Sequence, residues 1–333
     1  MRYGVTLQGT YDPASFGELA RWIEDLGYDD LWLTDSSLHA GDVWVYVTLA
    51  LQATTRLRVG TAVANPITRH PAITANAAAT VALYAPGRFV CGLGVGDSPL
   101  PEIGAKLAKV STLVTMTGTL RRLWAGETLD GEHGRHVYAG AKLRTPPGDI
   151  PVHYSASGPR TLQAAGQHAD GAIVLAGLFP EGLEYTLGHI ATGRAASTRP
   201  DFATTAFLYG AIDDDEATAL DAARSIVAWF PQMAPEHARM AGMSDELIAS
   251  VRAVYGGGEF QKASAAAALI DDDLVRKVAF AGTPATARAK LAWVREQGLD
   301  GVSVFPLGAD RLATVEAFAA LARADRGAAV PTP

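Results

Sequence analysis

Short apolar runs alternate with amphipathic stretches along nearly the whole chain. In the first such stretch, Leu19, Trp22, Ile23 and Leu26 recur at helical spacing and Gly27 follows them, which predicts a helix with one buried face. The apolar runs are mostly continuous, as is typical of parallel strands buried on both faces. We therefore expect eight strands, at residues 3–7, 30–34, 57–63, 89–95, 151–155, 171–175, 204–212 and 301–305.

Helical patterns follow these strands in a regular order. They cover residues 15–26, 44–53, 71–84, 159–168, a stretch after 180, 216–230, 284–297 and 309–324. Eight β/α units in one chain predict a closed (β/α)8 TIM barrel, and we expect residues 1–333 to form one domain. An open doubly wound sheet is the alternative. It is disfavoured because the glycines of the fourth strand do not spell G-x-G-x-x-G.

Two segments interrupt this rhythm and are expected to be insertions, after the fourth and seventh strands. Residues 126–150 are rich in Gly and Pro and indicate a loop or a short hairpin. Residues 232–283 contain helical patches and three consecutive glycines at 256–258. Insertions of this length in a compact domain usually form lids, interfaces or disordered segments.

Composition and charge restrict the classes of partner. The chain has 333 residues, 48% of them hydrophobic, and a formal net charge of −7. No stretch is strongly basic, so a nucleic-acid partner is disfavoured, and the negative charge argues against docking on an anionic membrane. No apolar run approaches the roughly 18 residues of a membrane span, and the N-terminus opens directly as a strand. We therefore expect a cytoplasmic protein.

Cysteine and histidine usage argues against a metal site. Cys91 is the one cysteine, and we expect it to be a small buried hydrophobe. A lone cysteine excludes thiolate clusters, and the eight histidines show no metal-ligand spacing. We expect no metal.

Polar residues directly after the strands are the candidates for chemistry, because barrel enzymes place their active sites at the carboxyl ends of the strands. Asp35 and His39 follow the second strand, and Asn65 precedes Pro66 after the third. Asp35 could instead be a helix N-cap or a loop anchor, and His39 could be a structural or merely solvated side chain. After the fourth strand, alternate glycines lead to Asp97, a candidate acid or base.

The exits of the fifth and sixth strands are candidates for binding an anion. The turn Ser157-Gly158-Pro159 runs into a predicted helix, whose N-terminal N–H groups favour negative charge, and Arg160 could add a cation. The small turn Ala176-Gly177 could complete a phosphate cradle. Ordinary tight βα loops remain the alternative for both.

Six stretches along the chain carry a family pattern: W-L-T-D (32–35), V-A-N-P-I-T-R-H-P-A-I-T-A (63–75), L-Y-A-P-G-R (83–88), G-L-G-V-G-D (92–97), S-A-S-G-P-R-T-L-Q-A-A-G-Q-H-A-D-G-A (155–172) and F-A-G-T-P (280–284). Taken together, they resemble the bacterial-luciferase-like flavin and deazaflavin superfamily, and within it the coenzyme F420-dependent methylenetetrahydromethanopterin reductases. The resemblance implies a barrel enzyme that holds F420, a deazaflavin that carries hydride only, and that assembles at least as a homodimer.

The resemblance also implies where the cofactor would lie. Its ring would rest on the exit of the third strand, where the family has a non-proline cis peptide that falls at Ala62–Val63 in this chain. Its phosphate would lie on the turn after the fifth strand and near the turn after the sixth. The cofactor-binding residues expected on this basis are Asp35, Ala62, Val63, Asn65, Val95, Gly96, Ser157, Gly158, Pro159, Ala176 and Gly177.

The chain departs from the family pattern on the substrate side. Many relatives have a histidine where this chain has Ser36, and the reductases have a first-strand glutamate where it has Thr6. The carboxylate after the fourth-strand glycines is kept as Asp97. We therefore expect Asp97 to be the proton donor, with His39 as the second choice, and we expect the substrate to differ from that of the relatives.

Three functions remain open at this point. The favoured one is an F420-dependent oxidoreductase that transfers a hydride between the deazaflavin and a small organic substrate. The alternatives are an FMN-dependent monooxygenase of the same superfamily and a non-catalytic barrel that binds a cofactor or a partner protein.

Overall fold

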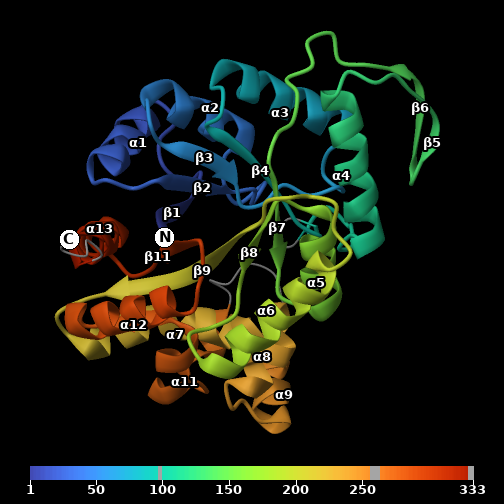
Figure 1. Ribbon diagram of the computed structural model, residues 1–333. Coiled ribbons are helices and arrows are strands. Elements are labelled where there is room, and N and C mark those ends of the chain that lie inside the picture. Colours follow the sequence, from blue (N-terminus) through green and yellow to red (C-terminus); the bar gives the residue numbers. More distant parts are fainter. Residues whose placement is uncertain (97–99, 256–262, 329–333) are drawn as a thin grey trace.

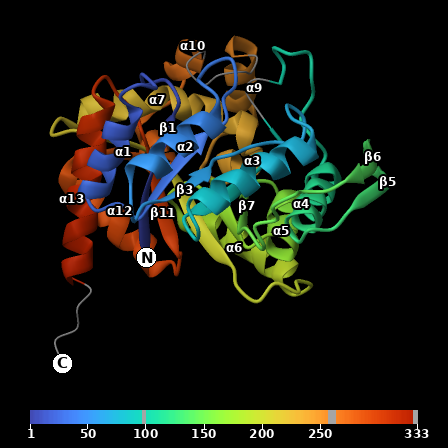
Figure 2. The same ribbon diagram turned by 90° about the horizontal axis from the view of Figure 1, so that it is seen from above.

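The computed structural model describes residues 1–96, 100–255 and 263–328. Eight parallel strands close into a barrel surrounded by helices, which confirms the predicted TIM barrel (Figures 1 and 2). In ring order the barrel strands are β1 (Arg2–Gln8), β2 (Asp30–Thr34), β3 (Arg58–Thr61), β4 (Phe89–Leu93), β7 (Val152–Ala156), β8 (Gly171–Val174), β9 (Ala203–Ile212) and β11 (Gly301–Pro306), which pairs again with β1.

The helices that follow the strands form the outer layer. Asp42 caps the second helix by accepting a hydrogen bond from the N–H of Trp44, and prolines occupy the first turns of the third and fifth helices. These helices are α1 (Phe16–Asp25), α2 (Val43–Ala53), α3 (Pro71–Tyr84), α4 (Val110–Trp124), α5 (Pro159–His168), α6 (Pro180–Arg194), α7 (Glu216–Met233), α12 (Pro284–Glu296) and α13 (Arg311–Ala328). No helix in the described ranges is long and apolar enough to cross a membrane.

The first insertion is an antiparallel hairpin of β5 (Leu129–His133) and β6 (His136–Ala141). It stands at the periphery of the barrel in both views of the ribbon (Figures 1 and 2). The second insertion supplies short helices, in agreement with the helical patches expected there, and one strand that the sequence pattern did not predict. The glycines at 256–258 lie outside the described residues. Its elements are α8 (Pro235–Met240), α9 (Asp245–Val254), α10 (Ser264–Ala267), α11 (Asp272–Val278) and β10 (Phe280–Gly282), which pairs with the end of β9.

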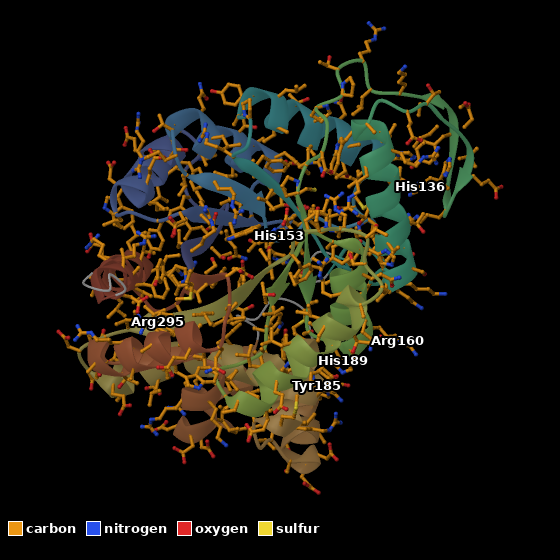
Figure 3. The ribbon with its side chains drawn as sticks, viewed as in Figure 1. His136, His153, Arg160, Tyr185, His189 and Arg295 are labelled. Carbon is orange, nitrogen blue, oxygen red and sulfur yellow. The ribbon has the colours of Figure 1, made fainter. Side chains whose placement is uncertain are left out.

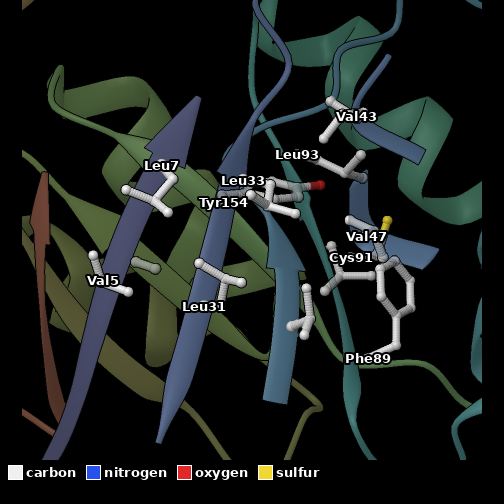
Figure 4. Packing of buried hydrophobic residues seen from close by; sticks show 14 of the residues in the cluster. Val5, Leu7, Leu31, Leu33, Val43, Val47, Phe89, Cys91, Leu93 and Tyr154 are labelled. Carbon is white, nitrogen blue, oxygen red and sulfur yellow. The ribbon is translucent and has the colours of Figure 1, made fainter. Parts of the chain in front are cut away.

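The main core lies between the strands and the outer helices. Leu31 and Leu33 of β2, Val47 of α2 and Leu93 of β4 are fully or almost fully buried in it (Figure 4). Cys91 lies in the same layer with no exposed surface, which confirms the expected buried thiol. Burial raises the pKa of that thiol to about 12, so it stays protonated and unreactive at neutral pH.

Aromatic side chains fill the barrel interior below its carboxyl end. The rings of Trp32 and His153 lie 5.7 Å apart, and His153 appears in the middle of the molecule in Figure 3. A Cβ at Gly60 would lie 2.5 Å from the Trp32 ring, so the glycine leaves room for the indole. Burial lowers the pKa of His153 to about 4, so the imidazole of His153 is uncharged at neutral pH.

Removing the carboxylate of Asp30, at the opposite end of the barrel, is expected to destabilise the fold. Its side chain is 4% exposed and accepts hydrogen bonds from Nε of Arg2 (2.9 Å) and Nε of Arg58 (2.6 Å). Burial alone would raise the pKa of Asp30, but the two guanidinium groups hold it below its usual value. We expect Asp30→Ala to lower the free energy of unfolding by about 3–5 kcal/mol in urea denaturation at pH 7.

The pH dependence of this loss provides its control. A carboxyl group whose pKa is lowered by folding stabilises the protein above its unfolded pKa and loses that contribution as the pH falls through the folded value. The difference between wild type and Asp30→Ala should therefore shrink in acid. A difference that is independent of pH would contradict a role for the charge.

Candidate active site

A cavity of about 400 Å³ opens at the carboxyl end of the barrel, where the site was expected. Because all the barrel strands end at this rim, each strand or its exit contributes to the wall. One lining residue from each, in ring order, is Gln8, Thr34, Ala62, Gly94, Ser155, Ile173, Phe207 and Phe305.

The wall after β3 is a bulge of the main chain. The peptide bond Ala62–Val63 is cis, as the family resemblance predicted. The N–H of Ala64 donates to the carbonyl of Gly92 (3.0 Å), and the N–H of Gly94 donates to the carbonyl of Ala64 (2.9 Å). These bonds fix the bulge against β4, so that Ala62 and Val63 face the cavity.

The glycines of β4 leave the space that the bulge occupies. A Cβ at Gly92 would lie 1.8 Å from the carbonyl oxygen of Thr61, and one at Gly94 would lie 2.6 Å from Cγ2 of Val63. A side chain at Gly92 would displace the backbone of the bulge, and one at Gly94 would displace the Val63 side chain. The alternate glycines are therefore required by the packing of β3 on β4, which is a physical reason for the pattern seen in the sequence.

Asn65 and Gly96 continue this wall, together with Val95. The Asn65 Oδ1 accepts hydrogen bonds from the N–H groups of Ile67 (2.9 Å) and Thr68 (3.0 Å). The carbonyl side of the amide thus holds the loop, and its NH2 group is the part that can donate to a ligand. Gly96 adopts a φ of +91°, which favours glycine at this turn.

The wall after β7 contains the N-terminus of α5. Ser157 and Gly158 line the cavity, whereas Pro159 does not, and Thr161, which the sequence reasoning missed, does. The Ser157 hydroxyl donates to the carbonyl of Met233 (2.7 Å) and ties this turn to α7. No side chain caps α5, so the N–H groups of its first turn can bind an anion. The exposed Arg160 lies beside them on the same helix (Figure 3).

The turn after β8 is packed against the second insertion. Ala176 and Gly177 are not among the cavity-lining residues, although Leu175 is. The N–H of Leu178 donates to the carbonyl of Lys277 (2.8 Å), and a Cβ at Gly177 would lie 2.5 Å from the ring of Phe179. The role of Ala176 and Gly177 in holding a phosphate stays a prediction.

A neutral polar corner lies at the ends of β1 and β2. The Gln8 amide nitrogen donates to the Ser36 hydroxyl (3.3 Å), which is 3.5 Å from the hydroxyl of Thr34. Gln8 was not predicted, although its place as the last residue of the first strand marks it as a rim residue. Thr6 lies deeper in the barrel, hydrogen-bonded to Ser303 at 2.7 Å. Uncharged groups thus occupy the region where the resemblance leads one to expect Glu and His.

Asp35 lies beside this corner and lines the cavity. Burial raises the pKa of its carboxyl group, and the Ser37 hydroxyl (2.8 Å) and the charge of Arg69 only partly oppose that shift. Among the cavity-lining residues within the described ranges, Asp35 is the one charged side chain. A partly buried carboxyl group with a raised pKa is suited to proton transfer.

Of the two predicted proton donors, the structure describes His39 but not Asp97. His39 is not among the cavity-lining residues, and its Nε2 lies 3.0 Å from Oε2 of Glu102. Asp97 lies outside the described residues. Both roles stay predictions.

An aromatic cluster forms the wall opposite the bulge, and the sequence reasoning missed it. Phe207 and Tyr209 of β9 have ring centroids 5.0 Å apart, and Tyr209 lies 6.0 Å from Trp229 and 5.6 Å from Phe305. All four side chains line the cavity. Phe207 and Tyr209 are two residues apart on one strand, so both point to the same face.

The chain is similar in sequence to known proteins over most of its length. The chain is 27% identical over 321 residues to a 5,10-methylenetetrahydromethanopterin reductase of Methanolobus tindarius, covering 93% of this chain and 96% of the relative. It is 28% identical over 266 residues to an F420-dependent glucose-6-phosphate dehydrogenase of Kineococcus radiotolerans, covering 71% of this chain and 77% of the relative.

A solved structure and a family model complete the comparison. The structure of the coenzyme F420-dependent tetrahydromethanopterin reductase of Methanopyrus kandleri shares the fold, with a TM-score of 0.82 and 24% identity over 96% of this chain and 97% of the other. The model of the luciferase-like monooxygenase family matches residues 1–301. The chain therefore belongs to the luciferase-like monooxygenase family.

Proposed function

We propose that this protein is a coenzyme F420-dependent oxidoreductase that transfers a hydride between the deazaflavin and a small organic substrate, in the manner of the methylenetetrahydromethanopterin reductases. The observation that carries the proposal is one cavity with a glycine-backed bulge at Ala62–Val63 on one wall and the N-terminus of α5 on the next. These walls fit a flat ring and an anionic tail, and a relative similar over 71% of this chain is an F420-dependent glucose-6-phosphate dehydrogenase.

The residues present fit a bound deazaflavin, which supplies a two-electron hydride donor or acceptor. Val63 would back the ring. Gly94 leaves room for this side chain, because a Cβ there would lie 2.6 Å from Cγ2 of Val63. The NH2 group of Asn65 would donate to a polar edge of the ring or of its tail. The N–H groups at the start of α5 would hold the phosphate, and Arg160 would add positive charge there.

The polar corner would orient the substrate and supply its proton. The Gln8 amide and the Ser36 hydroxyl can donate hydrogen bonds to an oxygen atom of the substrate. The raised pKa of Asp35 keeps its carboxyl group protonated to a higher pH than usual, so it can hold the proton that a carbonyl oxygen gains on reduction. We propose Asp35 for this role beside Asp97.

A binding comparison tests the proposed cofactor. F420, its fragment without the phosphate-bearing tail, and FMN are titrated against the purified protein by fluorescence quenching. We expect F420 to bind about tenfold or more tightly than the fragment and FMN, and its affinity to fall with added salt, because the N-terminus of α5 and Arg160 hold charge.

The other outcomes discriminate the alternatives. Tighter binding of FMN, together with oxygen consumption in the presence of reduced flavin, would favour the monooxygenase. Tight F420 binding without hydride transfer to any acceptor would favour the non-catalytic barrel. Failure of both cofactors to bind would contradict the proposal.

A further inference from the structure

The bulge and the aromatic cluster face each other across the barrel. β9 is four positions from β3 in the closed ring of eight strands, which is the diametrically opposite position. Val63 therefore lies across the cavity from Phe207 and Tyr209, and all three line it. If the cofactor ring rests on the bulge, as the proposed function requires, the substrate must lie between the free face of the ring and the aromatic wall.

The aromatic wall is apolar and preformed. Trp229 is 8% exposed and Phe305 is 4% exposed. Both rings pack edge-to-face on Tyr209, with centroid distances of 6.0 Å for Trp229 and 5.6 Å for Phe305. Leu175 and Met233 extend the same surface. A wall of this kind favours an apolar, preferably cyclic or aromatic, substrate body.

The charged groups of the cavity also favour an uncharged substrate. Its described lining residues include no Lys, Arg or His, and they include one carboxyl group, that of Asp35. Two neighbouring cations have partners elsewhere: Arg69 pairs with Asp42, and the ammonium group of Lys277 in α11 donates to a backbone carbonyl in the second insertion. A third cation, Arg160, is the one proposed to hold the cofactor phosphate. An anionic group on the substrate would lose its hydration there without gaining a cation.

The neutral polar corner sets the kind of polar group that fits. β1 and β2 lie between β11 and β3 in the ring, so Gln8 and Ser36 stand at one side of the gap between the two walls. An amide and a hydroxyl group match one uncharged oxygen atom.

We propose that this enzyme acts on a neutral, largely apolar carbonyl compound or the corresponding alcohol, and not on a phosphorylated sugar or another polyanion. In the reducing direction the hydride adds to the carbonyl carbon, the carbon–oxygen π bond breaks, and the oxygen takes a proton from an acid of the site. The two electrons come from reduced F420, which is oxidised in the same step.

Calorimetric binding to the F420-loaded protein tests this substrate class. The probes are 1-phenylethanol, which is neutral and aromatic, and glucose 6-phosphate. We expect 1-phenylethanol to bind about tenfold or more tightly, because glucose 6-phosphate would bring a dianion against a described lining that offers it no Lys, Arg or His. Equal or tighter binding of glucose 6-phosphate, or no binding of 1-phenylethanol, would overturn the inference. Failure of F420 to load would instead refute the proposed function.

Two variants connect the result to the aromatic wall. Trp229→Ala should weaken 1-phenylethanol binding about tenfold while the Kd for F420 stays unchanged. Trp44→Ala is the matched control, since Trp44 is 7% exposed on α2 and outside the cavity. Gln232 of α7 also lines the cavity, and Gln232→Arg, which adds a cation there, should tighten glucose 6-phosphate binding about tenfold. If neither wall variant changed either affinity, the substrate would not contact this wall.

Discussion

Replacing Gly92 by alanine is expected to abolish tight F420 binding and to lower the free energy of unfolding by about 3 kcal/mol. The new Cβ would lie 1.8 Å from the carbonyl oxygen of Thr61, a backbone atom that cannot turn away. The same carbonyl belongs to the residue that precedes the bulge, so relief of the clash must move Ala62 and Val63. Urea denaturation and fluorescence titration with F420 measure the two effects.

A glycine in open space is the control. Gly118, within α4, has no atom near an added Cβ, and alanine there should raise the free energy of unfolding by about 0.5–1 kcal/mol and leave F420 binding unchanged. Gly94→Ala is the intermediate case, because its Cβ would meet the movable side chain of Val63. It should cost less stability than Gly92→Ala and still weaken F420 binding. If Gly92→Ala behaved like Gly118→Ala, the bulge would not depend on this glycine.

The barrel could be predicted from the sequence because its elements repeat a simple periodicity. The bounds of β2, α3 and α5 agree with the predicted ranges, and the two helices begin at strong local signals, Pro71 and Pro159. β10 was missed because three residues carry no detectable pattern, and its pairing with β9 is a tertiary event.

The proposed cofactor side of the cavity was more predictable than the proposed substrate side. The bulge and the α5 turn each lie within one contiguous motif, so a family resemblance places them. The aromatic wall takes residues from β9, α7 and β11, and barrel closure brings these together. In the sequence Trp229 resembles any other apolar residue of an amphipathic helix. The role proposed for it follows from its position in the cavity wall opposite β3.

The structure changes the interpretation of Thr6 and Ser36, the two residues that depart from the family pattern. From the sequence they indicate that acid and base groups have been lost. The structure shows that Thr6 pairs with Ser303 and Ser36 with Gln8, so hydroxyl and amide groups build a neutral corner in their place. The proposed proton donor beside Asp97 is then Asp35, a carboxyl group that the resemblance assigned to cofactor binding.

Asp35→Asn is expected to lower kcat by about 10²–10⁴-fold while the Kd for F420 changes by no more than about threefold. In wild type, carbonyl reduction requires the protonated carboxyl group, so kcat should be high at low pH and fall as the pH rises through the raised pKa of Asp35. Alcohol oxidation requires the ionised form and should show the opposite trend. Both pH dependences should disappear in the variant, as measured by F420 absorbance over a pH series.

The stability of Asp35→Asn should not fall with its activity. Because burial raises the pKa of Asp35 in the folded protein, ionisation costs stability as the pH rises above the unfolded pKa. Asn removes that cost, so Asp35→Asn should unfold at the same or a higher temperature than wild type at pH 7, as is common for groups kept for catalysis.

Ser37→Ala is the companion variant, because it removes the 2.8 Å hydrogen bond that lowers the pKa of Asp35. The fall in carbonyl reduction should then occur at a higher pH than in wild type. A kcat of Asp35→Asn that keeps the wild-type pH profile would show that another acid supplies the proton. The same pH series on Asp97→Asn would then test the carboxyl group that the sequence placed first.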